Sequence, residues 1–109
     1  MASTQIVMLN EEGFQEAISR GGKVLVDFYA DWCGPCRMLS PVLETVASDS
    51  EVQKHATVAK IDIDAAQGIA STYNVTSIPT LVLFQDGKEL RRLVGLRDAN
   101  SIKHFIISN

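Results

Sequence analysis

One short segment constrains the fold of this chain more than any other. Residues 23–30 read Lys-Val-Leu-Val-Asp-Phe-Tyr-Ala, an almost continuous apolar run that a single charge, Asp27, interrupts. A strand with apolar side chains on both faces needs cover on both faces, which a central strand in a sheet packed between helices receives. The segment therefore predicts an α/β fold in which residues 23–30 form a buried central strand.

The pattern that follows this strand fits such a sheet. Apolar residues recur at helical spacing from about Cys33 to about Ser48, with Pro41 expected to kink the helix. Residues 57–63 then read as a strand, and residues 65–73 as a further helix. Because strand, helix and strand follow one another, the pattern predicts a parallel pairing with a right-handed crossover.

Both ends of the chain carry helix signals. Residues 4–9 predict a short strand, and Asn10 is a candidate cap for a helix that runs through Ile18. Near the other end, Asp98 or Asn100 is expected to begin a final helix. That helix is predicted from the i, i+3, i+4 spacing of three apolar residues, Ile102, Phe105 and Ile106.

A hairpin completes the sheet. Residues 80–84 predict a strand, and Asp86 and Gly87 are the strongest short hairpin signal in the chain. Residues 88–94 are then the antiparallel partner, so the expected sheet is mixed. No repeat or linker divides the sequence, and we expect one domain over residues 1–109.

Composition excludes several classes of partner. A chain of 109 residues with 46% hydrophobic residues is able to form a core. Its net charge of −3, without a basic run, argues against nucleic acid and anionic membranes. No apolar run approaches the roughly 20 residues of a spanning helix, and the first residues do not resemble a secretory signal. We therefore expect a cytoplasmic protein.

The only two cysteines, Cys33 and Cys36, lie three positions apart at the start of a predicted helix. A single close pair in a domain of this size is expected to be reactive rather than structural. At this spacing the Cβ atoms are about 5–6 Å apart, so a small adjustment lets the sulfurs bond or separate. The helix amino end favours a thiolate at Cys33, the expected attacking sulfur, while Cys36 can resolve a mixed disulfide.

The neighbours of the pair suit contact with another polypeptide. Gly34 presents no side chain, and Pro35 fits the first turn of a helix. Trp32 offers a flat apolar surface beside the sulfur, or it packs in the ordinary way. A zinc site needs four ligands, whereas the chain has no second cysteine pair and only the isolated His55 and His104. We therefore expect no metal and no cofactor other than the dithiol, with a two-thiolate metal carrier as an alternative.

Asp27 is a candidate proton acceptor. Burial in a central strand should raise its pKa toward neutrality, which would let it take the proton from Cys36. The alternative is an edge position at which Asp27 reaches solvent. Lys60 interrupts the strand at residues 57–63 in a similar way, and either pairs with Asp27 or is exposed.

Motifs along nearly the whole chain resemble the thioredoxin family. The central motif is Trp32-Cys33-Gly34-Pro35-Cys36, preceded by Asp27-Phe28-Tyr29-Ala30 and followed by Ile78-Pro79-Thr80. Further matches are Pro41, the stretch Ala59-Lys60-Ile61-Asp62, the Phe84 to Gly87 hairpin, and Val94-Gly95. The resemblance implies a mixed five-stranded sheet flanked by four helices, and a dithiol reductase of protein disulfides that a thioredoxin reductase re-reduces. We expect it to act as a monomer.

The resemblance also implies roles for individual residues. By position, Cys33 resembles the nucleophile, Cys36 the resolving thiol, Asp27 the buried proton acceptor and Lys60 its charged neighbour. The Ile78-Pro79 bond is expected to be cis and to lie against the disulfide.

A substrate groove follows from the same resemblance. Backbone groups of Ser77 and Ile78 are expected to pair with an extended target strand. An apolar groove is expected from Trp32, Gly34, Pro35, Ile78 and Gly95. The same rim is what a thiol-independent binding subunit would use, which is the alternative function. Ser77 and Leu96 depart from the residues that many relatives carry at these positions.

Overall fold

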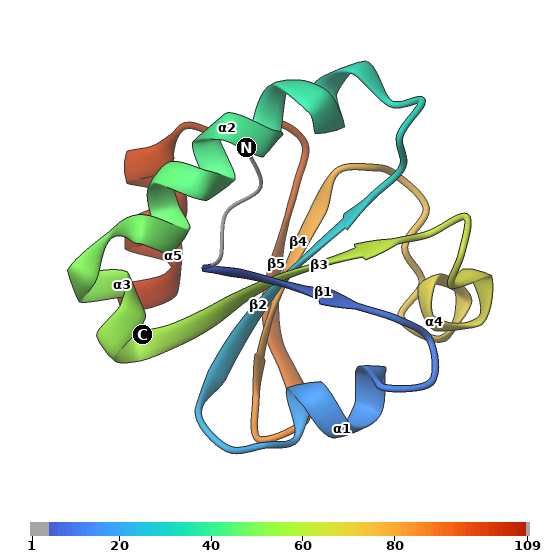
Figure 1. Ribbon diagram of the computed structural model, residues 1–109, viewed down its shortest axis with the longest axis horizontal. Helices are drawn as coiled ribbons and strands as arrows, with labels where there is room; N and C mark the ends of the chain where they lie inside the picture. Colours follow the sequence, from blue (N-terminus) through green and yellow to red (C-terminus); the bar gives the residue numbers. More distant parts are fainter. Residues whose placement is uncertain (1–4, 109) are drawn as a thin grey trace.

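A mixed sheet of five strands runs through the middle of the computed structural model, which describes residues 5–108 (Figure 1). The strands are β1 (Ile6–Leu9), β2 (Lys23–Tyr29), β3 (Ala56–Asp62), β4 (Thr80–Gln85) and β5 (Lys88–Val94). Their order across the sheet is β1-β3-β2-β4-β5. β3 pairs in parallel with both β1 and β2, whereas β4 pairs antiparallel with β2 and β5. The predicted mixed sheet with residues 23–30 at its centre is therefore confirmed.

Five helices, rather than the four expected, cover the sheet in the described part of the chain. They are α1 (Phe14–Ile18), α2 (Gly34–Ser48), α3 (Ser50–His55), α4 (Gln67–Thr72) and α5 (Ala99–Ile107). Figure 1 shows α2, α3 and α5 on one side of the sheet and α1 and α4 on the other. The additional helix is α3, which begins because Asp49 ends α2 and its carboxylate accepts the N–H groups of Glu51 and Val52.

Two apolar cores lie on the two faces of the sheet. Side chains of β2 alternate between them, since Leu25 belongs to the core under α2 and α5, whereas Val26 and Phe28 belong to the core under α1 and α4. The first core includes Leu39, Leu43, Leu81, Leu83, Ile102 and Ile106, and the second includes Phe14, Ile18, Ala59, Ile61, Val82 and Phe84. Both faces of β2 are therefore covered, as its apolar run predicted.

The starts of α1 and β1 differ from the expected bounds, and the ends of β2, β3, β4 and α4 differ from them by one or two residues. The Oδ1 atom of Asn10 accepts the N–H of Gly13 at 2.7 Å, but α1 itself begins only at Phe14, so Asn10 caps a turn rather than the helix. β1 begins at Ile6, and residue 4 lies outside the described residues. At the other end, Asp98 caps α5, one of the two starts expected from the sequence.

The hairpin between β4 and β5 turns at the predicted residues. Asp86 and Gly87 have φ angles of 53° and 85°, the left-handed region that a tight hairpin turn requires. The register then shifts, because Glu89 lies opposite Phe84 and Arg91 opposite Leu83, so that Leu90 is the extra residue of a β-bulge. No helix among the described residues is long and apolar enough to cross a bilayer.

Candidate active site

The two cysteines form a disulfide where β2 leads into α2. Cys33 is the residue before the helix and has an extended backbone, with φ −88° and ψ 114°. Cys36 lies one turn further on, and the two Cα atoms are 5.2 Å apart. Only 5% of Cys33 and 4% of Cys36 is exposed. The spacing that predicted a pair able to bond is confirmed.

The start of α2 directs a backbone donor at one of the two sulfurs. The N–H of Cys36 donates to the Sγ atom of Cys33 at 3.2 Å, while the N–H of Arg37 donates to the Cys33 carbonyl at 3.1 Å. Cys33 therefore fills the position in which a capping oxygen normally accepts the first free N–H group of a helix. Pro35 lies in the same turn, where its missing N–H group leaves no donor unpaired. The hydrogen bond and the helix dipole both favour negative charge on Cys33.

Trp32 lies at the surface rather than in a core. Its side chain is 67% exposed, and its Nε1–H donates to the Oδ2 atom of Asp64 at 2.9 Å. Asp64 follows β3, and the carboxyl ends of the parallel strands β2 and β3 meet at one edge of the sheet. Sequence reasoning missed Asp64 because no local pattern relates it to a tryptophan 32 positions away.

A second segment lies against the disulfide. The Ile78–Pro79 bond is cis, as the resemblance implied, and the Ile78 carbonyl oxygen is 3.8 Å from the Sγ atom of Cys33. Pro79 is buried and Ser77 is exposed. The N–H of Gly95 donates to the Pro79 carbonyl at 2.8 Å, which links the end of β5 to this segment.

The two glycines expected in the groove leave open space. A Cβ atom built on Gly34 or on Gly95 would meet no other atom within 4 Å. At Gly95 the φ of +96° also disfavours any side chain. Gly34 is exposed next to Cys33, whereas Gly95 is half-buried and lies beside Pro79.

Asp27 is fully buried in the central strand, so the alternative of an edge position is wrong. Neither of its carboxylate oxygens has a hydrogen-bond partner among the described residues. Burial raises the pKa of Asp27 to about 7, and the charge of Lys60 is a smaller effect in the opposite direction. The predicted shift toward neutrality is confirmed. Asp27 lies on the same face of β2 as Leu25, which is the face that α2 covers.

Lys60 is the register partner of Asp27 on the neighbouring strand β3. The two side chains form no ion pair within the described part of the chain, because the Nζ atom of Lys60 lies over the Tyr29 ring, 4.4 Å from its centroid. Lys60 therefore lies near Asp27 on the adjacent strand without a direct ion pair, and its charge lowers the pKa of Asp27 through space. Tyr29 was not predicted as its contact, although the alternation of β2 places Tyr29 on the same face as Asp27.

The remaining candidates for metal ligands lie elsewhere. His55 ends α3, where its Nδ1 atom is 2.9 Å from the Glu51 carbonyl oxygen, and His104 lies on α5. No group of three histidine, cysteine or acidic side chains arranged to hold a metal ion occurs within residues 5–108.

Comparison with known proteins reveals close relatives over nearly the whole chain. A family model described as Thioredoxin matches residues 5–108. The chain is 48% identical over 101 residues to a thioredoxin of Chlamydia trachomatis, which covers 93% of this chain and 95% of that protein. It is 44% identical over 96 residues to a bifunctional thioredoxin reductase/thioredoxin of Mycobacterium leprae, covering 88% of this chain and 20% of that protein. A solved structure of a mutant thioredoxin from Halobacterium salinarum has a TM-score of 0.85 and 44% identity, covering 99% of this chain and 94% of that one.

Proposed function

This chain belongs to the thioredoxin family, and from that premise we propose how its residues divide the work of thiol–disulfide exchange. It is a thiol–disulfide oxidoreductase, which reduces disulfides in target proteins through the Cys33–Cys36 pair. The observation that supports the division of roles best is the N–H of Cys36 directed at the Sγ atom of Cys33. That donor favours a thiolate on Cys33 once the pair is reduced.

Cys33 makes the first attack. Its thiolate forms a bond to one sulfur of the target disulfide, that disulfide breaks, and the released target sulfur leaves as a thiolate that takes a proton from solvent. The product is a mixed disulfide between Cys33 and the target. The open space at Gly34 and the exposed ring of Trp32 leave room for the target polypeptide at this stage.

Cys36 resolves the mixed disulfide. Its thiol gives a proton to Asp27, and its sulfur then bonds to the Sγ atom of Cys33 while the target leaves as its second thiolate. The target gains two electrons, and the Cys33–Cys36 dithiol loses them. A carboxyl group with a pKa of about 7 suits this step, because it accepts a proton near neutral pH and releases it again. Lys60, on the adjacent strand, moderates that pKa.

The segment at the cis-proline holds the target. Ser77 and Ile78 offer backbone groups for pairing with an extended target strand, and Pro79 closes the segment against the disulfide. Trp32, Pro35 and Gly95 complete an apolar rim for the side chains of the target. Binding through backbone groups suits a reductase that acts on many unrelated sequences.

Thioredoxins generally work with a thioredoxin reductase and with disulfide-containing proteins. We assign the same partners to this chain, and the relative from Mycobacterium leprae carries both names in one protein. The reductase returns two electrons and two protons to the Cys33–Cys36 disulfide, which requires no other cofactor on this chain. A dithiol that must be kept reduced fits the cytoplasm, and we assign the protein to that compartment. We assign the activity to a single domain over residues 1–109 that acts as a monomer.

Trapping tests the roles of the two cysteines. Cys36→Ser removes the resolving thiol, so the reduced variant should accumulate mixed disulfides on Cys33 when it is added to a cell extract in which target disulfides are intact and free reductant has been removed. They are detected as reductant-sensitive bands on electrophoresis. The matched control, Cys33→Ser, keeps Cys36 but should trap little. Equal trapping by both variants would contradict the assignment of Cys33 as the attacking sulfur.

A further inference from the structure

Residues 73–79 connect α4 to β4 without regular secondary structure, and they carry the target-binding Ser77 and Ile78. The end of this segment is held close to β4 and β5. The Thr80 hydroxyl donates to the Ser77 carbonyl at 2.5 Å, and the N–H of Gly95 donates to the Pro79 carbonyl. The path of the whole segment then depends on what holds its first residues.

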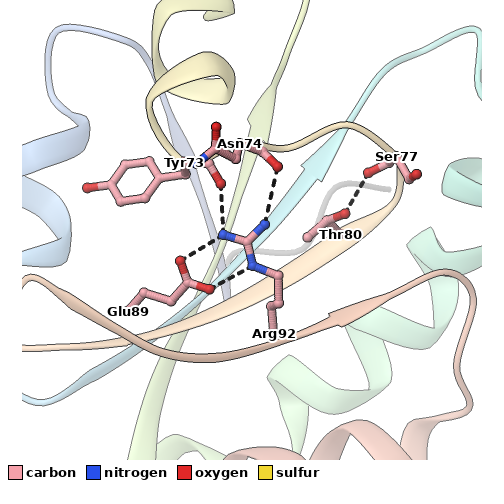
Figure 2. Close-up of polar contacts among 6 residues, drawn as sticks. All are labelled: Tyr73, Asn74, Ser77, Thr80, Glu89 and Arg92. Carbon is pink, nitrogen blue, oxygen red and sulfur yellow. Dashed lines mark hydrogen bonds and ion pairs between the residues drawn. The ribbon is translucent and has the colours of Figure 1, made fainter.

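Arg92 on β5 holds the first residues of the segment. Figure 2 shows its guanidinium group directed at two consecutive carbonyl oxygens, those of Tyr73 at 2.8 Å and of Asn74 at 3.5 Å. The last carbonyls of a helix lack helical partners, and a cation placed there interacts favourably with the helix dipole. Asn74 has a φ of 54°, the left-handed conformation at which the chain leaves the helix. Backbone hydrogen bonds from the N–H groups of Asn74 and Val75 close the end of α4, and Arg92 adds a side-chain tie at the point where the segment departs.

Glu89 in turn holds Arg92. Its two carboxylate oxygens accept from Nε and Nη2 of Arg92, both at 2.7 Å, and this pairing lowers the pKa of Glu89 (Figure 2). In a regular strand, residues three apart point to opposite faces. The bulge at Leu90 changes this, because it places Glu89 opposite Phe84 and Arg92 opposite Val82, on the same face of the sheet. The bulge thus builds the pair that orients the guanidinium group.

We propose that Arg92 is a positioning residue for protein-disulfide targets, because its tie to Tyr73 and Asn74 sets where Ser77 and Ile78 present their backbone. The inference rests on the proposed role of that segment in target binding. The Ile78 carbonyl is 3.8 Å from the Sγ atom of Cys33, so a displaced segment would shift a bound target relative to the attacking sulfur. Arg92 itself acts through the segment and not on the sulfurs.

Arg91 provides a matched control on the same strand. It points to the opposite face of the sheet, where its guanidinium group donates to the carbonyls of Phe105 and Ser108 and lies 5.3 Å from the Phe105 ring centroid. Each arginine therefore ties the end of one helix to β5. Only Arg92 ties the helix that leads into the target-binding segment.

The experiment compares Arg92→Ala with Arg91→Ala on two substrates, insulin as a protein disulfide and dithiobis(nitrobenzoate) as a small one. For Arg92→Ala we expect KM for insulin to rise about ten-fold, the size expected when hydrogen bonds from a charged group are lost. Its rate with the small disulfide should stay within about two-fold of the wild-type rate, since that reaction does not need the segment. Its reduction potential should equal that of the wild type within error. Arg91→Ala should leave both substrates unchanged, even where it lowers the melting temperature.

Two further variants keep the test decisive if Arg92→Ala folds poorly. Arg92→Lys retains the charge but loses the planar guanidinium group that donates to several acceptors at once. Glu89→Gln retains Arg92 but removes the charged partner that orients it. Both variants should therefore raise KM for insulin by smaller factors. An unchanged KM in all three variants, or an equal rise in Arg91→Ala, would overturn the inference. If the wild-type protein itself shows no preference for insulin over the small disulfide, relative to dithiothreitol, the segment's role in target binding fails and the inference fails with it.

Discussion

Two helices of this molecule begin with the same hydrogen bond but with different capping atoms. At α5, the Oδ1 atom of Asp98 accepts the N–H of Ser101 at 2.8 Å. At α2, the Sγ atom of Cys33 accepts the N–H of Cys36 at 3.2 Å. In both cases the acceptor belongs to an extended residue just before the helix, and the donor lies three positions later. The geometry of the two helix starts is therefore alike.

The difference lies in the charge that each cap carries. The hydrogen bond from the Ser101 backbone lowers the pKa of Asp98, so α5 begins with a permanent anion at neutral pH. The sulfur at α2 is an anion only when the dithiol is reduced, and it loses that charge on forming the disulfide. A common way of ending a helix thus becomes a redox site when sulfur replaces oxygen and a second sulfur lies one turn away. Three predictions test how far the likeness between the two helix starts extends.

The largest effect is expected from Cys33→Ser, which keeps a capping oxygen but removes the attacking sulfur. Insulin reduction should fall to the rate of the chemical reductant alone, because Cys36 lacks the directed backbone donor. The fold should persist, since serine is a good capping residue. Cys33→Ala should be equally inactive but less stable than Cys33→Ser by about 1 kcal/mol in denaturant unfolding. Equal stabilities for the two variants would show that the cap at α2 contributes nothing to folding.

The second prediction concerns Asp27, whose carboxylate is buried in a strand and is not placed at a helix start. Burial raises the pKa of Asp27 from 3.8 to about 7, the opposite direction to Asp98. The folded protein therefore binds a proton at Asp27 more tightly than the unfolded chain does. The contribution to stability is complete below pH 3.8 and is lost as the pH rises to about 7. One pKa unit corresponds to about 1.4 kcal/mol, so the total is on the order of 4 kcal/mol.

Asp27→Asn should remove that dependence. Above pH 7 the variant should be more stable than the wild type, and the two free energies of unfolding should converge toward acid pH, as denaturant titrations at several pH values would measure. Release of the target from the mixed disulfide should slow by about 100-fold, the usual size of a proton-transfer contribution, with the first attack little changed. Parallel stability curves for the two proteins would rule out a raised pKa at Asp27.

The sequence predicted the features that local patterns encode. The apolar run of β2 identified the central strand and the burial of Asp27, and the spacing of Cys33 and Cys36 identified a pair able to bond at a helix start. The hairpin at Asp86 was equally local. The short helix α3 was missed because its signal is one capping residue, Asp49, directly after a longer helix.

Contacts between distant residues left no signal of this kind. Lys60 rests on the Tyr29 ring, and Trp32 donates to Asp64, only because β2 and β3 are adjacent in register. The tie from Arg92 to Tyr73 depends on a bulge that places Glu89 and Arg92 on one face. Periodicity within a segment reports which face is buried, but it does not report which side chain on another segment meets it.

The smallest effect is expected from a thiol placed at the start of α5. Asp98→Cys, in a protein that also carries Cys33→Ser and Cys36→Ser, should give a thiol that ionises below the ordinary value of about 8.5, because the Ser101 N–H and the helix dipole remain. Thiolate absorbance against pH measures this ionisation. Asn100→Cys in the same background is the matched control, since it shares the dipole of α5 but not the capping position.

If the cap hydrogen bond is what favours charge on Cys33, the thiol at position 98 should ionise at lower pH than the thiol at position 100. It should nevertheless reduce insulin no faster than a simple monothiol, because no second sulfur lies one turn away to release the target. Ionisation at the same pH in both variants would mean that the dipole alone acts, and that the likeness between the two helix starts does not extend to their chemistry. The two halves of the site, an anion held by a helix start and a resolving neighbour, are separable by this pair of variants.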